Sequence, residues 1–453
     1  MNVNGKHVLV CGMARSGKLL LSLGAQVTIT DTKPEADFGG ALDELRAPGC
    51  VFALGQAADA LIAGQDMMII SPGIAWAKPF VQSAIAQGVE VMGELELGAR
   101  LTKGALVAIT GTNGKTTTTT LVGELFRAAG RTTHVVGNIG YPFTACALQC
   151  GEEDVAVAEV SSFQLETITT FHPHIAVMCN ITEDHLNRHG TMEEYIRVKE
   201  RIFENMGQGD YAVLNLDDPI VRGMAERIPC APAFFSRRQE VETGAYLEGE
   251  EVVFSLNGHK KRVLRADEIR IPGEHNLENA LAATALAMLA GVPAPVVRHT
   301  LRAFQGVEHR LEFVRELDGV RYINDSKGTN VDSTLWAVRS MTAPTVIILG
   351  GSYKKADYHP LGRELMRGNI THAVLIGDTA DAIEAALKDE GFTRCVRAGY
   401  DFPKAIATAR SLAAPGGNVL LSPACASFDM FTDYEARGRE FKRIVKDLEP
   451  NMA

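Results

Sequence analysis

Short β-rich segments alternate with helical patterns along almost the whole chain, and this alternation restricts the fold more than any other feature. Each segment is rich in Val, Ile and Leu, is bounded by Gly, Asn or Asp, and is followed by a helical pattern. Such βαβ units form mostly parallel sheets. The predicted strands include residues 7–12, 26–31, 67–73, 106–111, 133–138, 155–162, 174–180, 211–217, 345–351, 372–378 and 418–424.

The predicted strands fall into three blocks, which indicates three α/β domains. The length of 453 residues agrees with this number at roughly 150 residues per domain. We place the domains at residues 1–95, 96–305 and 306–453. Within the middle block, residues 233–272 are more charged and alternate in polarity, so a set of antiparallel hairpins is expected there.

Composition argues against several classes of protein. Residues 1–17 lack the basic, apolar and cleavage regions of a signal peptide, which favours a cytoplasmic protein. The most apolar stretch, residues 277–292, is interrupted by Glu278, Asn279 and Thr284, so no membrane insertion is expected. The formal net charge of -10 argues against nucleic-acid binding, which needs a basic face. The eight cysteines form no C-x-x-C pair and are expected to be reduced.

A glycine-rich segment, GTNGKTT at residues 111–117, follows a predicted strand and precedes a helix. It is shorter than the usual phosphate loop G-x-x-x-x-G-K-[ST], whose first glycine would fall at Ile109. Its two glycines still let backbone N–H groups approach phosphate oxygens, and the helix that follows presents its positive N-terminus. Lys115 adds a charge, and the hydroxyl of Thr116 is able to ligate Mg²⁺. The segment predicts triphosphate binding; an ordinary strand-to-helix turn is the structural alternative.

Two other classes of enzyme are compatible with parts of the sequence. Residues 12–17 have the form G-x-A-x-x-G after a strand, and Asp31 ends the next strand, as in a nicotinamide-dependent dehydrogenase. Ala14 replaces the middle glycine, however, and a dehydrogenase leaves residues 111–117 unexplained. A regulatory P-loop NTPase explains residues 111–117 and leaves the later motifs unexplained.

Those later motifs carry a family resemblance that covers essentially the whole chain. GTNGKTTT is similar to the ATP loop of the Mur ligase superfamily, which also includes folylpolyglutamate synthetases. Further segments resemble the superfamily in the same order: AEVSSFQLE (158–166), NITEDHLNRHG (180–190), YIRVKERIF (195–203), IPGEHNLENALAA (271–283), VEHRLE (307–312), NDSKGTN (324–330), LGGSYKKADY (349–358) and LLSPACASFDMF (420–431). The combination of SSFQLE, NDSKGTN and SPACASFD is more specific than any single motif and most resembles the members that add D-glutamate.

The resemblance implies a fold and a reaction. The fold is a Rossmann-like N-terminal domain, a central P-loop ATPase domain with a mostly parallel sheet, and a C-terminal Rossmann-like α/β domain. The reaction is ATP-dependent: a carboxylate of UDP-N-acetylmuramoyl-L-alanine is phosphorylated, and D-glutamate then displaces phosphate in cytoplasmic peptidoglycan precursor synthesis. Two Mg²⁺ sites and a monomeric enzyme are expected. The alternative within the superfamily is a ligase that adds a different amino acid.

The resemblance also implies roles for individual residues. The residues expected at ATP are Gly111, Thr112, Asn113, Gly114, Lys115, Thr116, Thr117, Asn276, Arg310 and Asp325. Those expected at the metal ions are Thr116, Glu159, His185 and Lys199, the last as a carbamate formed with CO₂. Those expected at the UDP substrate are Ser16, Thr32, Ser71, Pro72, Gly73, Asn138 and His185. Those expected at D-glutamate are Lys327, Thr329, Lys354, Ser427, Phe428 and Tyr434, and the catalytic set is Lys115, Asn138, His185, Lys199 and Lys327.

One segment departs from the family pattern. Only KLLLSL separates Gly17 from Gly24, where the family has a helix about two turns longer. A shortened helix is expected to leave apolar sheet surface uncovered and to change the surroundings of Ser16.

Overall fold

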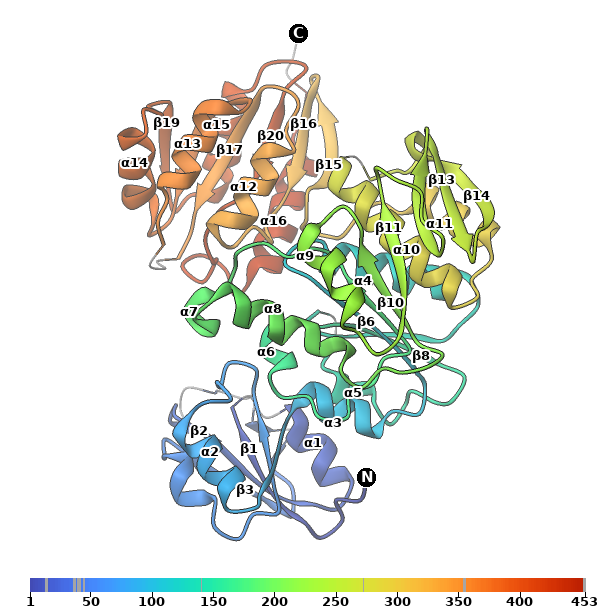
Figure 1. The fold of residues 1–453 in the computed structure, drawn as a ribbon. Coiled ribbons are helices and arrows are strands. Elements are labelled where there is room, and N and C mark those ends of the chain that lie inside the picture. Colours follow the sequence, from blue (N-terminus) through green and yellow to red (C-terminus); the bar gives the residue numbers. More distant parts are fainter. Residues whose placement is uncertain are drawn as a thin grey trace. The chain divides into compact units, whose positions relative to one another are not determined.

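The computed structural model describes residues 1–12, 15–35, 38, 42–43, 45–139, 141–271, 273–352 and 356–450. The chain divides into two compact units, Met1–Phe304 and Gln305–Ala453. The first unit contains two sheets and the second contains one (Figure 1). All three sheets are mostly parallel, which confirms the predicted α/β class.

The N-terminal sheet has five parallel strands in the order β3-β2-β1-β4-β5. The chain leaves β1 toward β2 on one side and later returns to β4 on the other, so the strand order reverses between β1 and β4. Ligands bind at such a reversal in open α/β sheets. The bounds are β1 His7–Cys11, α1 Arg15–Ser22, β2 Gln26–Asp31, β3 Cys50–Leu54, β4 Met67–Ile70, α2 Pro79–Ala86, β5 Glu90–Gly93 and α3 Glu94–Leu101.

Helix α1 is short, with eight residues. The sheet face beside it is nevertheless covered in part by another segment, because Leu42 and Leu45 lie in the same buried cluster as Leu20 of α1 and Ile29 of β2. Ser16 is also buried. The expected uncovered face is therefore partly filled by side chains from outside the helix.

The central sheet has nine strands in the order β14-β13-β12-β11-β10-β9-β6-β8-β7. The seven strands from β12 to β7 in this order pair in parallel, whereas β13 and β14 are antiparallel. The predicted hairpins are thus confirmed for residues 244–265, and β11 belongs to the parallel part. The strands are β6 Ala105–Thr110, β7 Thr133–Gly137, β8 Val155–Glu159, β9 Ile175–Met178, β10 Tyr211–Asn215, β11 Ala231–Ser236, β12 Gly244–Glu248, β13 Glu251–Leu256 and β14 His259–Arg265.

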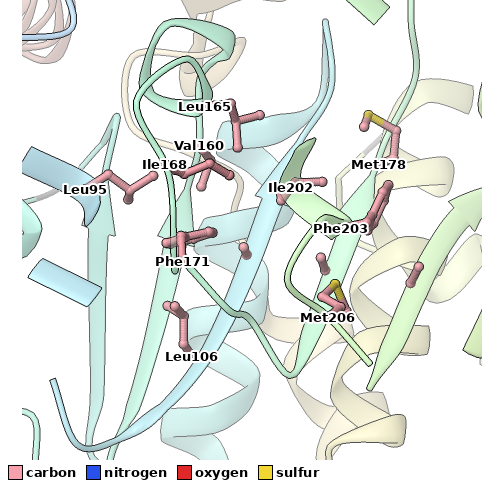
Figure 2. Close-up of a cluster of buried hydrophobic side chains, with 14 of the residues drawn as sticks. Leu95, Leu106, Val160, Leu165, Ile168, Phe171, Met178, Ile202, Phe203 and Met206 are labelled. Carbon is pink, nitrogen blue, oxygen red and sulfur yellow. The ribbon is translucent and has the colours of Figure 1, made fainter. Parts of the chain in front are cut away.

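Helices cover both faces of the central sheet. On one face α4 packs against α10 and α11. The other face carries the buried cluster of Figure 2, in which Leu106 and Met178 from the strands meet Leu165 of α6, and Ile202 and Phe203. The helices are α4 Lys115–Ala128, α5 Phe143–Cys146, α6 Ser162–Leu165, α7 Leu186–His189, α8 Met192–Glu200, η3 Arg201–Phe203, α9 Pro219–Arg222, α10 Glu274–Leu289 and α11 Ala294–Ala303.

The second unit is a six-stranded sheet in the order β15-β16-β20-β17-β18-β19. Only the edge strand β15 pairs antiparallel. One buried cluster lies on each face of the sheet. The elements are β15 Glu312–Leu317, β16 Val320–Asn324, α12 Val331–Arg339, β17 Thr345–Gly350, α13 His359–Arg367, β18 Ile370–Ile376, α14 Ala380–Asp389, β19 Cys395–Gly399, α15 Phe402–Leu412, β20 Asn418–Leu421 and α16 Tyr434–Asp447.

None of the helices in the described part of the chain is long and apolar enough to cross a bilayer.

The threonine run in α4 is explained by burial, because Thr116–Thr119 all lie inside the unit. The hydroxyl of Thr118 contacts Oδ1 of Asn279 at 3.3 Å. The buried hydroxyl of Thr119 has no hydrogen-bond partner within the described residues. A buried hydroxyl without a partner costs stability.

We expect Thr119→Val to raise the free energy of unfolding by about 1 kcal/mol, because it removes an unsatisfied hydroxyl with little change of shape. Thr118→Val is the matched control and should lower stability, since it removes the Asn279 contact. Urea unfolding followed by circular dichroism measures both changes. Equal effects of the two substitutions would contradict this account of the run.

Candidate active site

The carboxyl ends of β8, β6 and β9 lie side by side, because these neighbouring strands are parallel. After β6 the chain continues into residues 111–114, which we call the phosphate loop. After β8 it continues into the segment that follows Glu159, and after β9 it continues into Cys179 and Asn180. Polar groups that are far apart in the sequence are thereby brought to one edge of the central sheet.

Two glycines allow the phosphate loop to lie close to its neighbours. Gly111 has a φ of 145°, and a Cβ there would lie 2.8 Å from Cβ of Cys179. Gly114 has a φ of 81°, and a Cβ there would lie 2.3 Å from Oδ1 of Asn279. Both positions therefore require glycine for conformation and for space.

Asn180 fixes the conformation of the phosphate loop. Its Oδ1 accepts a hydrogen bond from the backbone N–H of Asn113 at 2.8 Å, and its Nδ2 donates to the carbonyl of Asn113 at 3.2 Å. The Thr112 hydroxyl lies 3.1 Å from the hydroxyl of Tyr195. The loop is thus held from two sides before any ligand binds.

Lys115, the first residue of α4, curls back over the phosphate loop. Its Nζ donates to the carbonyl oxygens of Gly111 and Thr112, at 2.9 and 2.8 Å. The ammonium therefore lies where a phosphate group cradled by the loop would meet it. Asn276, in the first turn of α10, accepts a hydrogen bond from Nδ2 of Asn279 at 3.3 Å, which connects it to the residue beside Gly114.

Glu159 ends β8 with a carboxylate that is almost completely buried. Its Oε1 accepts a hydrogen bond from Nδ2 of Asn138 at 2.8 Å, and its Oε2 has no hydrogen-bond partner within the described residues. A buried carboxylate oxygen without a partner is costly unless a cation binds it. The oxygen of Glu159 and the hydroxyl of Thr116 are also donor types that Mg²⁺ prefers, so these residues fit a magnesium ion.

Lys199 is a second buried charge-bearing residue at this edge, with 2% of its surface exposed. Its Nζ donates to the carbonyl of Gly111 at 2.8 Å and to the hydroxyl of Thr110 at 3.3 Å. Burial, and then the neighbouring Lys115 ammonium, lower the pKa of the Lys199 amine well below its usual range. The amine is therefore biased toward its neutral, nucleophilic form.

His185 is the N-cap residue that immediately precedes α7, and its backbone lies in the left-handed region with a φ of 54°. Its ring lies against that of Phe163, with 4.8 Å between the ring centroids, and its Nε2 is 3.4 Å from the Asp184 carboxylate. The side chain is half exposed. The structure therefore presents this imidazole at the surface, with an acidic neighbour beside it.

Two loops in the second unit carry most of the residues expected at the amino acid. Lys327 follows β16, and its Nζ lies 6.0 Å from the ring centroid of Tyr434. Ser427 follows β20, and its buried hydroxyl has no hydrogen-bond partner within the described residues. Phe428 is 73% exposed. Cationic, hydroxyl and aromatic side chains on these two loops are the types that bind a small anionic ligand.

Comparison with known proteins gives matches over all three sheets. The Mur ligase MurD-like N-terminal domain matches residues 6–93, the Mur ligase middle domain matches 109–287, and the Mur ligase glutamate ligase domain matches 309–425. The chain is 47% identical over 448 residues to the UDP-N-acetylmuramoylalanine–D-glutamate ligase of Pelotomaculum thermopropionicum, covering 98% of each chain. It is 42% identical over 454 residues to the enzyme of that name from Clostridioides difficile, covering 99% of this chain and all of the other.

The chain belongs to the Mur ligase family. Solved structures agree on the fold: the UDP-N-acetylmuramate-alanine ligase MurC of Thermotoga maritima matches with a TM-score of 0.59 at 20% identity, over 97% of this chain and 99% of the other. MurF of Acinetobacter baumannii matches with a TM-score of 0.59 at 17% identity, over 94% and 86%. Recognition from the sequence motifs is thereby confirmed, and this Mur ligase is an ATP-dependent enzyme whose family uses Mg²⁺.

Five of the residues of this Mur ligase expected at the UDP substrate, Ser16, Thr32, Ser71, Pro72 and Gly73, follow strands of the N-terminal sheet, whereas Asn138 and His185 belong to the central sheet region. A Cβ at Gly12, after β1, would lie 2.7 Å from Cβ of Ser71, after β4, so the two strand ends approach closely. Ser16 is buried in α1 and Thr32 is exposed after β2. Pro72 and Gly73 follow Ser71 in the same turn.

A pair of charged residues that sequence reasoning missed holds this turn. Arg188 donates to the carbonyl oxygens of Gly73 and Ile74, at 3.3 and 3.1 Å, and to both carboxylate oxygens of Glu166, at 3.0 and 2.7 Å. The Glu166 carboxylate also accepts from the backbone N–H of Trp76 at 3.4 Å. Both residues stand inside quoted motifs, SSFQLE and NRHG, but their partners lie about 90 to 115 positions away, so no local pattern could reveal the pairing.

In the second unit, sequence reasoning missed Arg437 on α16. This guanidinium is fully buried and donates to Ser326, next to Lys327, and to the carbonyl oxygens of Cys425 and Ala426, next to Ser427. Burial lowers its pKa to about 10. Arg437 thus joins the two loops that carry Lys327 and Ser427.

The remaining predicted residues have varied settings. Asp325 is buried, accepts from the Ser422 hydroxyl at 2.6 Å and from the backbone N–H of Leu311 at 3.2 Å, and burial raises its pKa to about 6. Arg310 is partly buried, and Thr329 follows Lys327 in the same loop. Lys354 lies outside the described residues.

The low pKa of Lys199 gives a test by pH. Unfolding lets this lysine take up a proton at any pH between its lowered folded pKa and its ordinary value of 10.5, so wild-type stability rises with pH in that window. Lys199→Met has no such proton uptake. In CO₂-free buffer between pH 7 and 9.5, wild type should therefore gain stability relative to Lys199→Met, by up to about 1.4 kcal/mol per pH unit.

Urea unfolding at several pH values measures this difference. Lys103→Met, at an exposed position, controls for the simple loss of a lysine. If the difference in free energy of unfolding between wild type and Lys199→Met does not change with pH, Lys199 keeps its proton in the folded protein.

Proposed function

We propose that this Mur ligase joins D-glutamate to UDP-N-acetylmuramoyl-L-alanine, with conversion of ATP to ADP and phosphate, in peptidoglycan precursor synthesis. The observation that carries the chemistry is the juxtaposition of the phosphate loop, the unpartnered Glu159 oxygen and the Lys199 amine at one sheet edge. The substrates rest on the relatives named for this reaction, which are 42% to 47% identical over nearly the full chain.

The reaction proceeds in two steps. A carboxylate oxygen of the UDP-linked substrate attacks the γ-phosphorus of ATP, and the bond to the β-phosphate oxygen breaks, which gives an acyl phosphate and ADP. The amine of D-glutamate then attacks the acyl carbon, phosphate leaves, and the nitrogen loses a proton. Both steps bring anionic groups together, so positive charge and directed N–H groups are required.

The first unit supplies these groups at ATP. Backbone N–H groups of Gly111 to Thr117 bind phosphate oxygens, and Lys115 exchanges its two carbonyl partners for the γ-phosphate. Mg²⁺, held by Thr116 and Glu159, neutralises phosphate charge when bound. Asn276, Arg310 and Asp325 are proposed to complete ATP binding, and His185 is proposed as a further metal and substrate contact.

Lys199 is proposed to provide a second metal site as a carbamate. A neutral amine adds to CO₂ to give an N-carboxylate and a proton, whereas an ammonium cannot. Burial and Lys115 favour the neutral amine. The product turns a residue that cannot ligate a cation into an oxygen donor close to the phosphate loop.

The other substrates are assigned to loops described above. Ser16, Thr32, Ser71, Pro72 and Gly73 are proposed to bind the UDP moiety, and Asn138 the muramoyl side. Lys327, Thr329, Lys354, Ser427, Phe428 and Tyr434 are proposed to bind D-glutamate, whose two carboxylates need cationic and hydroxyl partners. Lys327 is also proposed to act in catalysis.

The cellular location, the oligomeric state and the domain boundaries of the enzyme are also proposals. We place the reaction in the cytoplasm, with a monomeric enzyme that binds no nucleic acid and does not insert into membranes. The domain boundaries proposed for it are residues 1–95 for the UDP substrate, 96–305 for ATP and 306–453 for the amino acid.

Phosphate release tests the function directly. We expect release only when ATP, Mg²⁺, UDP-N-acetylmuramoyl-L-alanine and D-glutamate are all present. L-Glutamate is the matched control, because it differs only in handedness, and a panel of other amino acids distinguishes ligases that share this fold. Release that depends on a different amino acid would replace D-glutamate, and release without any amino acid would indicate a simple ATPase.

The carbamate has a separate test. Removal of CO₂ should lower wild-type activity, and bicarbonate should restore it. Lys199→Ala should lose about a hundredfold or more in turnover and should not respond to bicarbonate, whereas formate or acetate should restore part of the activity by replacing the lost carboxylate. Wild-type-like turnover of Lys199→Ala would eliminate this role and would leave the proposed reaction standing.

A further inference from the structure

Three side chains with metal-binding chemistry meet on the opposite edge of the central sheet, away from the phosphate loop. His134 lies at the start of β7, Asp154 immediately precedes β8, and Cys150 lies in the connection between α5 and β8. Their ligand atoms all lie within 4.8 Å of one another. The catalytic proposal uses none of these residues.

The imidazole of His134 points Nε2 toward the Asp154 carboxylate. Its Nε2 is buried and has no hydrogen-bond partner within the described residues. It lies 3.5 Å from Oδ2 of Asp154, which is long for a hydrogen bond. Two donors held about 2.0 to 2.2 Å from one tetrahedral ion are about 3.4 Å apart, so this spacing suits a shared metal.

The sulfur of Cys150 is buried next to Gly104. Burial raises the pKa of this thiol, the Asp154 carboxylate adds to the rise, and the Thr102 hydroxyl and the Gly104 N–H offset it only in part. A metal ion would therefore bind this sulfur by displacing the thiol proton. A Cβ at Gly104 would lie 2.6 Å from Sγ of Cys150, so the glycine leaves room for the sulfur and its donors. The thiolate is the form of cysteine that binds metals.

We propose that His134, Cys150 and Asp154 form a site for Zn²⁺ or a similar borderline-soft divalent ion, with water as the fourth ligand. Nitrogen and sulfur donors favour such ions over Mg²⁺, which prefers oxygen alone. One thiolate and one carboxylate neutralise a divalent ion. The His134 and Asp154 side chains are 20% and 18% exposed, which gives the ion a path from solvent.

This site is separate from the proposed magnesium site. Asp154 and Glu159 stand at opposite ends of β8, and five residues of strand span about 16 Å. A metal here would link the edge strand β7 to β8 and to the segment after α5. It would therefore act on the stability of this sheet edge and would leave the reacting groups untouched.

Cobalt(II) is a suitable probe, because a bound thiolate gives it a charge-transfer band that oxygen and nitrogen ligands do not. Titration of the full chain under a non-chelating reductant should give this band at one ion per chain. Zn²⁺ should remove the band and excess Mg²⁺ should not. Cys150→Ser should lose it, while Cys146→Ser, at a neighbouring buried thiol, should keep it.

The more exposed ligands give a second measurement that does not disturb the buried sulfur. Zn²⁺ should raise the wild-type unfolding temperature, because it binds only the folded chain. His134→Ala and Asp154→Asn should remove this shift and weaken Co²⁺ binding about tenfold or more. Glu153→Gln, at the adjacent exposed carboxylate, is the matched control and should keep the shift.

Circular dichroism without metal checks that each variant is folded. A thiolate band that survives Cys150→Ser, or a Zn²⁺ shift that survives both His134→Ala and Asp154→Asn, would overturn the assignment. Absence of any thiolate band in folded wild type would also overturn it.

Discussion

The close approach of the phosphate loop to its neighbours is the constraint on which the rest of the first unit's site depends. With no side chain at Gly111 or Gly114, the loop fits between the end of β9 and the start of α10. Asn180 can then bond the loop backbone from one side, while Asn279 lies beside Gly114 on the other. The carbonyl of Gly111 is also the acceptor for both Lys115 and Lys199, so the position of this peptide sets the positions of two amines.

Glu159, Lys199 and Arg437 are three of the buried ionisable side chains, and each meets the cost of burial differently. One carboxylate oxygen of Glu159 has no hydrogen-bond partner in the described part of the chain, so a bound cation would offset the cost of its burial. Lys199 is shifted toward its neutral form. Arg437 stays charged, because its guanidinium donates to several oxygen atoms of the surrounding backbone and of Ser326. The arrangements at Glu159 and Lys199 are suited to metal binding and catalysis, whereas the arrangement at Arg437 holds two loops together.

Much of the architecture could be predicted because its signals are local. Gly-bounded apolar runs identify most strands, and Glu159 could be predicted as a site residue from the motif at the end of its strand. Asn180 was not predicted, because its contact with the phosphate loop joins two distant segments. The edge strand β3, Cys50–Leu54, was not predicted, because it is only partly buried and therefore lacks a continuous apolar run. The Glu166–Arg188 pair, Arg437 and the His134 cluster depend on contacts between distant segments. Ordinary surface charge is the default interpretation of such residues in a sequence, and only the tertiary structure distinguishes them.

The position of Arg437 near the end of the chain also has a consequence for biosynthesis. Domains generally fold in order as the chain emerges from the ribosome. The phosphate loop and its contacts with Asn180 and Tyr195 lie within the first 304 residues. The loops after β16 and β20 obtain their shared guanidinium only when α16 has been made. A chain whose translation stops before α16 would therefore contain the complete phosphate loop. Its loops after β16 and β20 would lack the Arg437 guanidinium that joins them.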